Sequence, residues 1–312
     1  MKNKIKIFHF AGYLLLGAII YFTIDLKTFI ENLSKISLST AALLILAATV
    51  DRFAMAAKWK QLCSVLNFTT GFSQYLKIYY VATFLGYFLP TSIGGEVYKA
   101  ARLSRFETSH DVLASMFVEK VVAVFSTVSF AWAGVLYITF NLNNNNSATL
   151  FYILSGFTIA AIVITAASLH DALQERVIQL LEKFKFGKYI KKLSTTYSGY
   201  KKHPQAVLIN FLMAVFETAL QLVIMCAIGI ALNIELSLPL LASIIAITEF
   251  IRRIAIILDG WGLATALQIF MYGLVGMTTE EALLIALITH AVHLTASLPG
   301  GLIILTDRWD KK

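Results

Sequence analysis

The chain has 312 residues, of which 58% are hydrophobic and 14% are charged. Because about a quarter of the residues in soluble domains are charged, this composition excludes an ordinary water-soluble protein and predicts one integral membrane domain over residues 1–312. The formal net charge of +8 lies in short Lys and Arg clusters between apolar segments, with no basic face. We therefore expect no nucleic acid partner.

Apolar segments near the roughly 20 residues needed to cross the hydrocarbon core recur along the whole chain. They occupy residues 7–25, 41–66, 74–89, 111–140, 148–168, 206–232, 238–258, 263–277 and 282–306. Lysines precede the first segment as in a signal peptide, but no convincing small-residue cleavage site follows, so we expect an uncleaved first helix. Several of the other segments are too short or too broken to be plain spans.

Positive charge predicts the topology, because loops rich in Lys and Arg face the cytoplasm. The longest polar connector, 169–205, is strongly basic and is predicted to be cytoplasmic. The cluster at Lys58 and Lys60 and both termini are assigned to the same side. Aromatic residues interleave with the lysines of the connector, which suits either an amphipathic surface segment or a plain loop.

Two segments are expected to return to the side from which they entered. The first, 74–105, consists of an apolar helix, a break at 90–95 and a short polar helix, which predicts a re-entrant hairpin entered from the cytoplasm. The second, 238–277, is broken at 259–262. It must turn back to the outer face if both basic termini are cytoplasmic.

The expected fold class is an all-α integral membrane protein with about six full transmembrane helices and two re-entrant broken-helix hairpins. Hairpins that enter from opposite faces are typical of an inverted repeat, with the binding site where they meet near the midplane. The alternative is that all nine apolar segments are ordinary spans. That arrangement would place the two basic termini on opposite faces.

The glycine-broken segments are the first candidates for a binding site. Non-helical backbone at membrane depth is tolerated only where it is buried in protein or faces a wet cavity. Gly94 and Gly95 leave backbone N–H groups free at the start of a helix, where a phosphate is favoured. A tight turn or close helix packing would explain the same glycines.

Charged residues within apolar segments are a sharper signal, since each costs about 2.5–3.5 kcal/mol at a helix centre and tends to be paired or functional. Arg and Lys side chains suit a phosphate-bearing head group, and nearby Glu side chains would hold these cations when lipid is absent. The candidate lipid-binding residues are Pro90, Gly94, Gly95, Glu96, Lys99, Arg102, Glu119, Lys120, Glu249, Arg252, Arg253 and Asp259. The alternative role of such charged residues is charge pairing between helices. For Arg252 and Arg253 the alternative is that their side chains snorkel to a membrane interface.

Further polar residues lie inside the predicted spans. They are Asp51, Arg52, Glu217, Gln221, His290 and His293. Asp51 and Arg52 point about 100° apart on one helix, so each needs a partner on another helix. The two histidines are expected to be packed and hydrogen-bonded, with a role as ligands as the alternative.

Motifs for catalysis are missing from the sequence. It has no GxxxxGK[ST] phosphate loop, no HExxH motif, no CxxC pair and no DxD pair. The two cysteines have no metal or redox spacing. We therefore expect neither an ATP-driven pump nor a self-contained transferase, and no cofactor or metal.

A family resemblance is carried by two stretches, FLPTSIGGEVYKAARL from Phe88 to Leu103 and ASMFVEK from Ala114 to Lys120. They resemble the lysylphosphatidylglycerol synthase transmembrane family, also called flippase-like. Its members show a Leu-Pro, two glycines, an acidic residue and an Arg before the next span, which carries a Glu and a basic residue. The residues to which the resemblance carries over are Pro90, Gly94, Gly95, Glu96, Arg102, Glu119 and Lys120. The chain departs from the family at DGWGLA, residues 259–264, where relatives have a proline and a Gly-Gly-x-Gly-Glu-like run.

The resemblance implies translocation of an anionic phospholipid or a polyprenyl-phosphate-linked lipid between leaflets of a plasma or inner cell membrane. The soluble synthase domain of fused relatives is absent from this sequence, so we expect a stand-alone member that is not an enzyme. The alternatives are a component or enzyme of glycolipid assembly associated with a glycosyltransferase, and a structural lipid-binding subunit. A homo-oligomer is one expectation for the assembly.

Overall fold

The chain is an all-α membrane protein. The computed structural model describes residues 31, 34–88, 93–141, 151–152, 154–156, 158–160, 162–163, 196–197, 199–254 and 261–306, and these ranges hold no strand. Four of their helices are long and apolar enough to cross a membrane. They are α3 (Leu38–Ser64), α6 (Ser109–Asn141), α10 (Pro204–Ala231) and α13 (Thr279–Thr306).

These four helices agree with four of the six predicted full spans. They contain 27 to 33 residues, and at 1.5 Å per residue each is longer than the hydrocarbon core of about 30 Å. The predicted span 7–25 lies outside the described residues. The predicted span 148–168 is described only in part, between 151 and 163, where the described residues are helical.

Short polar signals set the starts of the long helices. The Ser37 hydroxyl accepts a hydrogen bond from the Thr40 N–H at 3.1 Å and caps α3. Pro204 begins α10, where its fixed φ suits the first turn and its missing N–H is not needed. At the start of α13, the Thr278 hydroxyl accepts from the Glu281 N–H and the Glu281 carboxylate accepts from the Thr278 N–H, which is a capping box.

Two pairs of shorter helices flank the breaks predicted from the glycines. The first pair is α4 (Phe72–Phe88) and α5 (Ile93–Leu103), the second is α11 (Leu238–Ile254) and α12 (Trp261–Gly273), and a single 3-10 turn, η1 (Tyr200–Lys202), precedes α10. The predicted breaks at 90–95 and 259–262 extend too far, because residues 93–95 already belong to α5 and residues 261–262 to α12. Residues 89–92 and 255–260 lie outside what the structure describes. The helices of each pair pack against each other.

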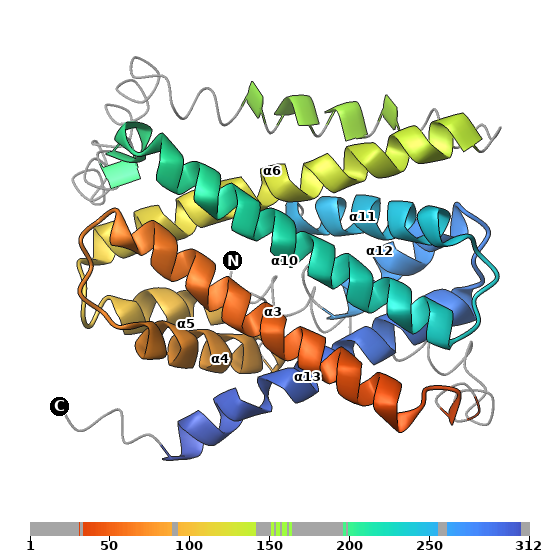
Figure 1. The fold of residues 1–312 in the computed structure, drawn as a ribbon, viewed down its shortest axis with the longest axis horizontal. Coiled ribbons are helices and arrows are strands. Elements are labelled where there is room, and N and C mark those ends of the chain that lie inside the picture. Colours follow the sequence, from red (N-terminus) through yellow and green to blue (C-terminus); the bar gives the residue numbers. More distant parts are fainter. Residues whose placement is uncertain are drawn as a thin grey trace, which may run out of the picture.

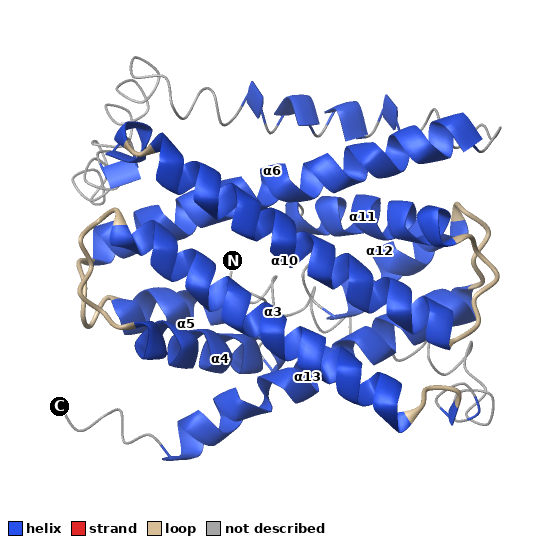
Figure 2. Cartoon of the chain, viewed as in Figure 1, coloured by secondary structure: helices blue, strands red, loops and turns tan. Residues whose placement is uncertain are grey.

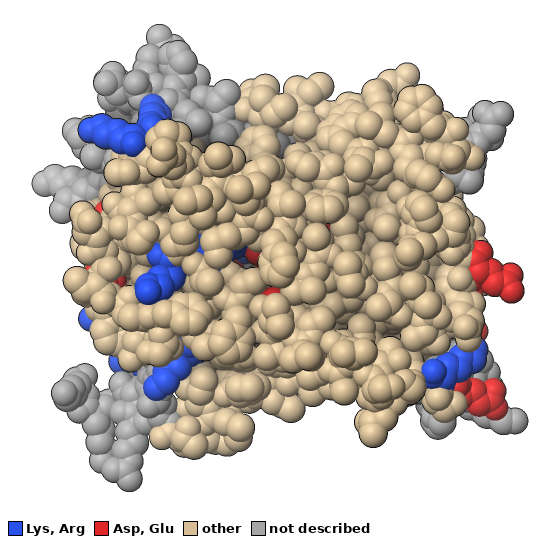
Figure 3. Space-filling model, viewed as in Figure 1, with Lys and Arg blue, Asp and Glu red and all other residues tan. Residues whose placement is uncertain are grey.

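The two pairs lie at opposite ends of the long helices (Figure 1). Each pair starts and finishes at its own end, and the connecting loops drawn in tan gather at these two ends (Figure 2). Most exposed charged side chains on the visible face also lie toward the ends, while tan atoms cover most of the middle (Figure 3). A pair that returns to the end where it started has the geometry that a re-entrant hairpin requires. The position of the ends relative to a membrane stays a prediction.

The packing follows a repeated order of elements. One long helix, one broken pair and a second long helix occur twice, as α3, α4–α5, α6 and as α10, α11–α12, α13. The last helix of each unit packs on the first helix of the other unit's pair, because α6 contacts α11 and α13 contacts α4, while α3 contacts α10. This exchange of partners is the arrangement expected of an inverted repeat.

Glycines permit the closest of these contacts. A Cβ at Gly134 of α6 would lie 2.8 Å from the Ser243 carbonyl oxygen of α11, and a Cβ at Gly95 of α5 would lie 2.6 Å from the Ala82 carbonyl oxygen of α4. A Cβ at Gly300 of α13 would overlap the backbone of Tyr80 on α4. Small residues let membrane helices approach in this way where apolar burial alone gives little drive to associate.

Candidate functional site: a buried ionic network

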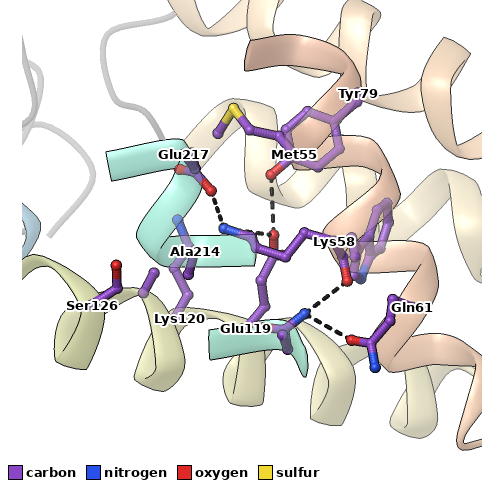
Figure 4. A network of polar contacts seen from close by, with 12 residues as sticks. Met55, Lys58, Gln61, Tyr79, Glu119, Lys120, Ser126, Ala214 and Glu217 are labelled. Carbon is purple, nitrogen blue, oxygen red and sulfur yellow. Dashed lines mark hydrogen bonds and ion pairs between the residues drawn. The ribbon is translucent and has the colours of Figure 1, made fainter. Parts of the chain in front are cut away.

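Lys58 is the centre of a network of charged side chains inside the bundle. It lies on α3 with 2% of its surface exposed. Its ammonium group forms an ion pair with Glu217 on α10 and lies 3.8 Å from Glu119 Oε1 on α6 (Figure 4). Because a buried charge without a partner is strongly destabilising, these two carboxylates make a buried lysine tolerable in an apolar span.

From Glu119 the network continues to the first broken pair. Lys99 Nζ on α5 lies 3.6 Å from Glu119 Oε2 and 3.2 Å from Glu96 Oε2. The Tyr79 hydroxyl of α4 donates a hydrogen bond to Glu119 Oε1 at 3.2 Å. Lys99 also lies over the Tyr79 ring, 4.4 Å from its centroid, which adds a cation–π contact. Lys120 Nζ approaches Glu96 Oε1 at 3.0 Å, but the Lys120 side chain is 61% exposed.

From Glu217 the network continues to the second broken pair. Arg253 Nη2 on α11 donates to Glu217 Oε1 at 3.3 Å and to Gln221 Oε1 at 3.1 Å. Its side chain is 20% exposed, so this cation is less enclosed than Lys58 or Lys99.

Taken together, these contacts form one continuous series in which cations and carboxylates alternate. In order it is Lys120, Glu96, Lys99, Glu119, Lys58, Glu217 and Arg253. The series starts on α6 and α5 and ends on α11, so it joins the two broken pairs through the long helices α3, α6 and α10.

A smaller charged group lies beside this series on α3. Arg52 Nη1 is 3.7 Å from Asp51 Oδ2, and Arg52 Nη2 is 2.8 Å from Nδ1 of His293 on α13. Asp51 is fully buried and is close enough to Lys58 and Glu217 to interact with them electrostatically. Within the part of the chain that the structure describes, neither Asp51 oxygen accepts a hydrogen bond. Asp51 is also the central residue of α3, as far from either end as the span allows.

Five of the predicted site residues meet in the network. These are Glu96, Lys99, Glu119, Lys120 and Arg253. Gly95 packs on α4, so its contact supports close helix packing, and Gly94 is half-buried at the start of α5. Arg102 and Glu249 are buried on α5 and α11 and each makes a polar or electrostatic interaction within the chain. Pro90, Asp259 and the side chain of Arg252 lie outside what the structure describes.

The candidate list from the sequence lacked four members of the network, Lys58, Tyr79, Glu217 and Gln221. Lys58 was assigned to a cytoplasmic basic cluster, whereas the structure buries it inside α3. Glu217 carried a signal as an acid within a predicted span, but its partner could not be named from the sequence. Tyr79 gave no signal, because a tyrosine in an apolar helix is ordinary.

The site holds no arrangement typical of metal binding. Among the described residues no group of three or more His, Cys, Asp or Glu side chains could hold a metal ion. The carboxylates of the network are instead each matched to Lys or Arg.

The fold and the network define a multi-pass membrane protein that holds a series of charged residues inside its helical bundle. The family model of the lysylphosphatidylglycerol synthase TM region matches residues 9–300. The chain therefore belongs to this family, which confirms the resemblance and indicates a lipid-related function in a membrane. Searches of curated proteins and of solved structures found no significant match.

Proposed function

We propose that this protein moves an anionic phospholipid or a polyprenyl-phosphate-linked lipid between the leaflets of a cell membrane. The observation that carries the proposal is the buried series of alternating charges between the two broken helix pairs. A bundle that needed only stability would gain little from it, since buried ion pairs are often replaceable by apolar side chains without loss.

The series offers a phosphate successive cations at membrane depth. A head group that reaches Arg253, Lys58 or Lys99 would replace a carboxylate as the acceptor of that cation's hydrogen bonds. The displaced carboxylate keeps its second cation, because Glu217 and Glu119 each face two. Exchange of partners therefore avoids leaving any charge unpaired in a medium where that would cost several kcal/mol.

The charge balance favours an anionic ligand. The network and the adjacent group contain five cations, Arg52, Lys58, Lys99, Lys120 and Arg253, and four carboxylates, Asp51, Glu96, Glu119 and Glu217. The single excess cation is the largely exposed Lys120, and the resulting positive charge suits a phosphodiester head group better than a cationic one. We further propose that the protein does this without enzymatic activity.

Translocation in vesicles tests the proposal. Purified protein would be placed in phosphatidylcholine vesicles with a trace of fluorescent phosphatidylglycerol, and an impermeant reductant added outside. Loss of signal beyond the outer-leaflet fraction is expected with the protein and not in protein-free vesicles. Arg253→Ala should slow the loss, while Lys201→Ala, at an exposed lysine of η1, should not.

Two results would count against this function. If phosphatidylglycerol stays in its leaflet with wild-type protein, translocation of this lipid is excluded. If the lipid recovered from the vesicles is covalently changed, an enzyme of lipid assembly is the better description.

A further inference from the structure

An apolar groove runs along the outer surface between α3 and α10. It is lined by Ala54 of α3 and by Ile209, Leu212, Met213 and Phe216 of α10, and has a volume of about 380 Å³. Leu212 is 58% exposed and Phe216 is 53% exposed, so the groove opens to the outside of the bundle. We call it the α3–α10 groove.

The wall of this groove lies on the same helical turns as the centre of the ionic network. Ala54 is one turn before Lys58 on α3, and Phe216 directly precedes Glu217 on α10. Lys58 and Glu217 form the ion pair behind the seam where the two helices pack. The lining of the groove and the central ion pair are therefore carried by neighbouring residues on both helices.

The seam is also where charged atoms are visible from outside. In the common view of the figures, α3 and α10 are the front helices (Figure 1). Blue and red atoms are recessed among tan atoms in the middle of the face that these helices form (Figure 3). Arg253, which contacts Glu217 from α11, is partly exposed, with 20% of its side-chain surface accessible.

We propose that the α3–α10 groove binds one acyl chain of an anionic phospholipid whose head group reaches the ionic network between the two helices. The inference rests on the proposed function and places a binding site for the transported lipid on the side of the helical bundle. The volume is near the lower end of the range of about 300–1,000 Å³ for ligand pockets, which suits one hydrocarbon chain. Arg253, a partly exposed cation that contacts Glu217 next to Phe216, favours an anionic lipid over the zwitterionic lipids that also touch this face.

Photocrosslinking tests the groove without relying on transport. The full chain would be placed in phosphatidylcholine vesicles that contain either phosphatidylglycerol or phosphatidylcholine with a diazirine on one acyl chain. At equal probe content, crosslinks at residues 209–216 should favour phosphatidylglycerol by roughly fivefold or more, the ratio that about 1 kcal/mol of selectivity produces. Equal yields would mean that any membrane lipid fills the groove, and would overturn the proposal.

A filled groove provides the second test. Ala54→Phe should reduce the phosphatidylglycerol crosslinks several-fold, as should Leu212→Trp from the opposite wall. Ala42→Phe makes the same change at an exposed position of α3, outside the groove, and should leave them unchanged. Thermal unfolding in detergent shows whether Ala54→Phe or Leu212→Trp is misfolded. If one of them is misfolded, the crosslinks of the other variant test the groove.

The outcomes separate this inference from the proposed function. Selective crosslinks that Ala54→Phe and Leu212→Trp remove, without translocation by wild-type protein, would keep the groove as a lipid site and refute transport. Translocation with unselective crosslinks, or with crosslinks that survive both groove variants, would keep transport and refute the groove. Crosslinks between two copies of the chain at 209–216 in place of lipid would also refute it.

Discussion

Lys58 on α3 and Glu217 on α10 form an ion pair inside the bundle, and Glu217 lies at the middle of its helix. Both side chains are almost fully buried. The pair therefore joins two long helices, α3 and α10, inside the bundle, where an unpaired charge would be strongly destabilising. A hydrogen bond also connects the two helices at this point, because Asn210 Nδ2 of α10 donates to the Lys58 carbonyl oxygen of α3 at 2.8 Å.

The first prediction concerns this pair. Lys58→Met should lower the free energy of unfolding by about 3–5 kcal/mol, because it leaves Glu217 and Glu119 facing each other without the ammonium group. The double variant Lys58→Met, Glu217→Gln should recover at least about 1 kcal/mol of that loss. Unfolding in mixed detergent micelles measures both. Strictly additive losses would show that the two side chains are not coupled.

The second prediction contrasts two lysines that share one partner. Lys99 and Lys120 both contact Glu96, at 3.2 and 3.0 Å, but Lys99 is buried and Lys120 is largely exposed. Lys99→Met should destabilise the protein by several kcal/mol because it strips buried Glu119 of a cation. Lys120→Met should cost at most about 1 kcal/mol. Equal losses in the same micelles would contradict the burial of Lys99.

The third prediction tests the close contact between α6 and α11. Gly134→Ala places a Cβ 2.8 Å from the carbonyl oxygen and 2.9 Å from the Cα of Ser243, so the helices must separate at a cost of about 1–3 kcal/mol. Gly86→Ala on α4 is the matched control, since its Cβ meets nothing within 4 Å. The control should be neutral or slightly stabilising, because alanine favours a helix over glycine. A Gly134→Ala protein as stable as Gly86→Ala would rule out this packing.

The fourth prediction tests the opposed directions of the broken pairs. Ser109 and Thr278 are exposed at the starts of α6 and α13, each directly after one pair. Single cysteines there, with buried Cys63 and Cys226 replaced by alanine, should react with an impermeant thiol reagent from opposite sides, with Ser109 cytoplasmic. Labelling from the same side would exclude opposed hairpins.

Much of the fold follows from hydropathy and charge in the sequence. The span predicted at 206–232 is observed as Pro204–Ala231, and the long helices at 41–66, 111–140 and 282–306 are likewise found within a few residues. Breaks were predicted at 90–95 and 259–262 because glycine and proline interrupt helices at membrane depth, but α5 and α12 begin inside these ranges, at Ile93 and Trp261. The packing of α6 on α11 was not predictable, since it depends on the shape of Gly134 against Ser243 and no local pattern encodes that contact.

The site was predictable only in part for a similar reason. Glu119 stands out because a charge in an apolar helix is costly wherever it lies, and Lys99 because it lies on the polar helix that follows the glycines. Their connection through Lys58 could not be predicted from the sequence. A lysine six residues before the end of a span looks the same in the sequence whether its side chain reaches the interface or turns inward. The inward direction is fixed by Glu217, which lies 159 residues away in the sequence.

The central claim is that the ionic network is the path of an anionic lipid, and the Lys58→Met, Glu217→Gln double variant tests it most directly. This variant removes the central ion pair but should regain at least about 1 kcal/mol of the stability that Lys58→Met loses. Its rate of phosphatidylglycerol translocation in vesicles should fall about tenfold or more, equivalent to roughly 1.4 kcal/mol, although the protein is folded. Translocation at the wild-type rate by the folded double variant would contradict the account.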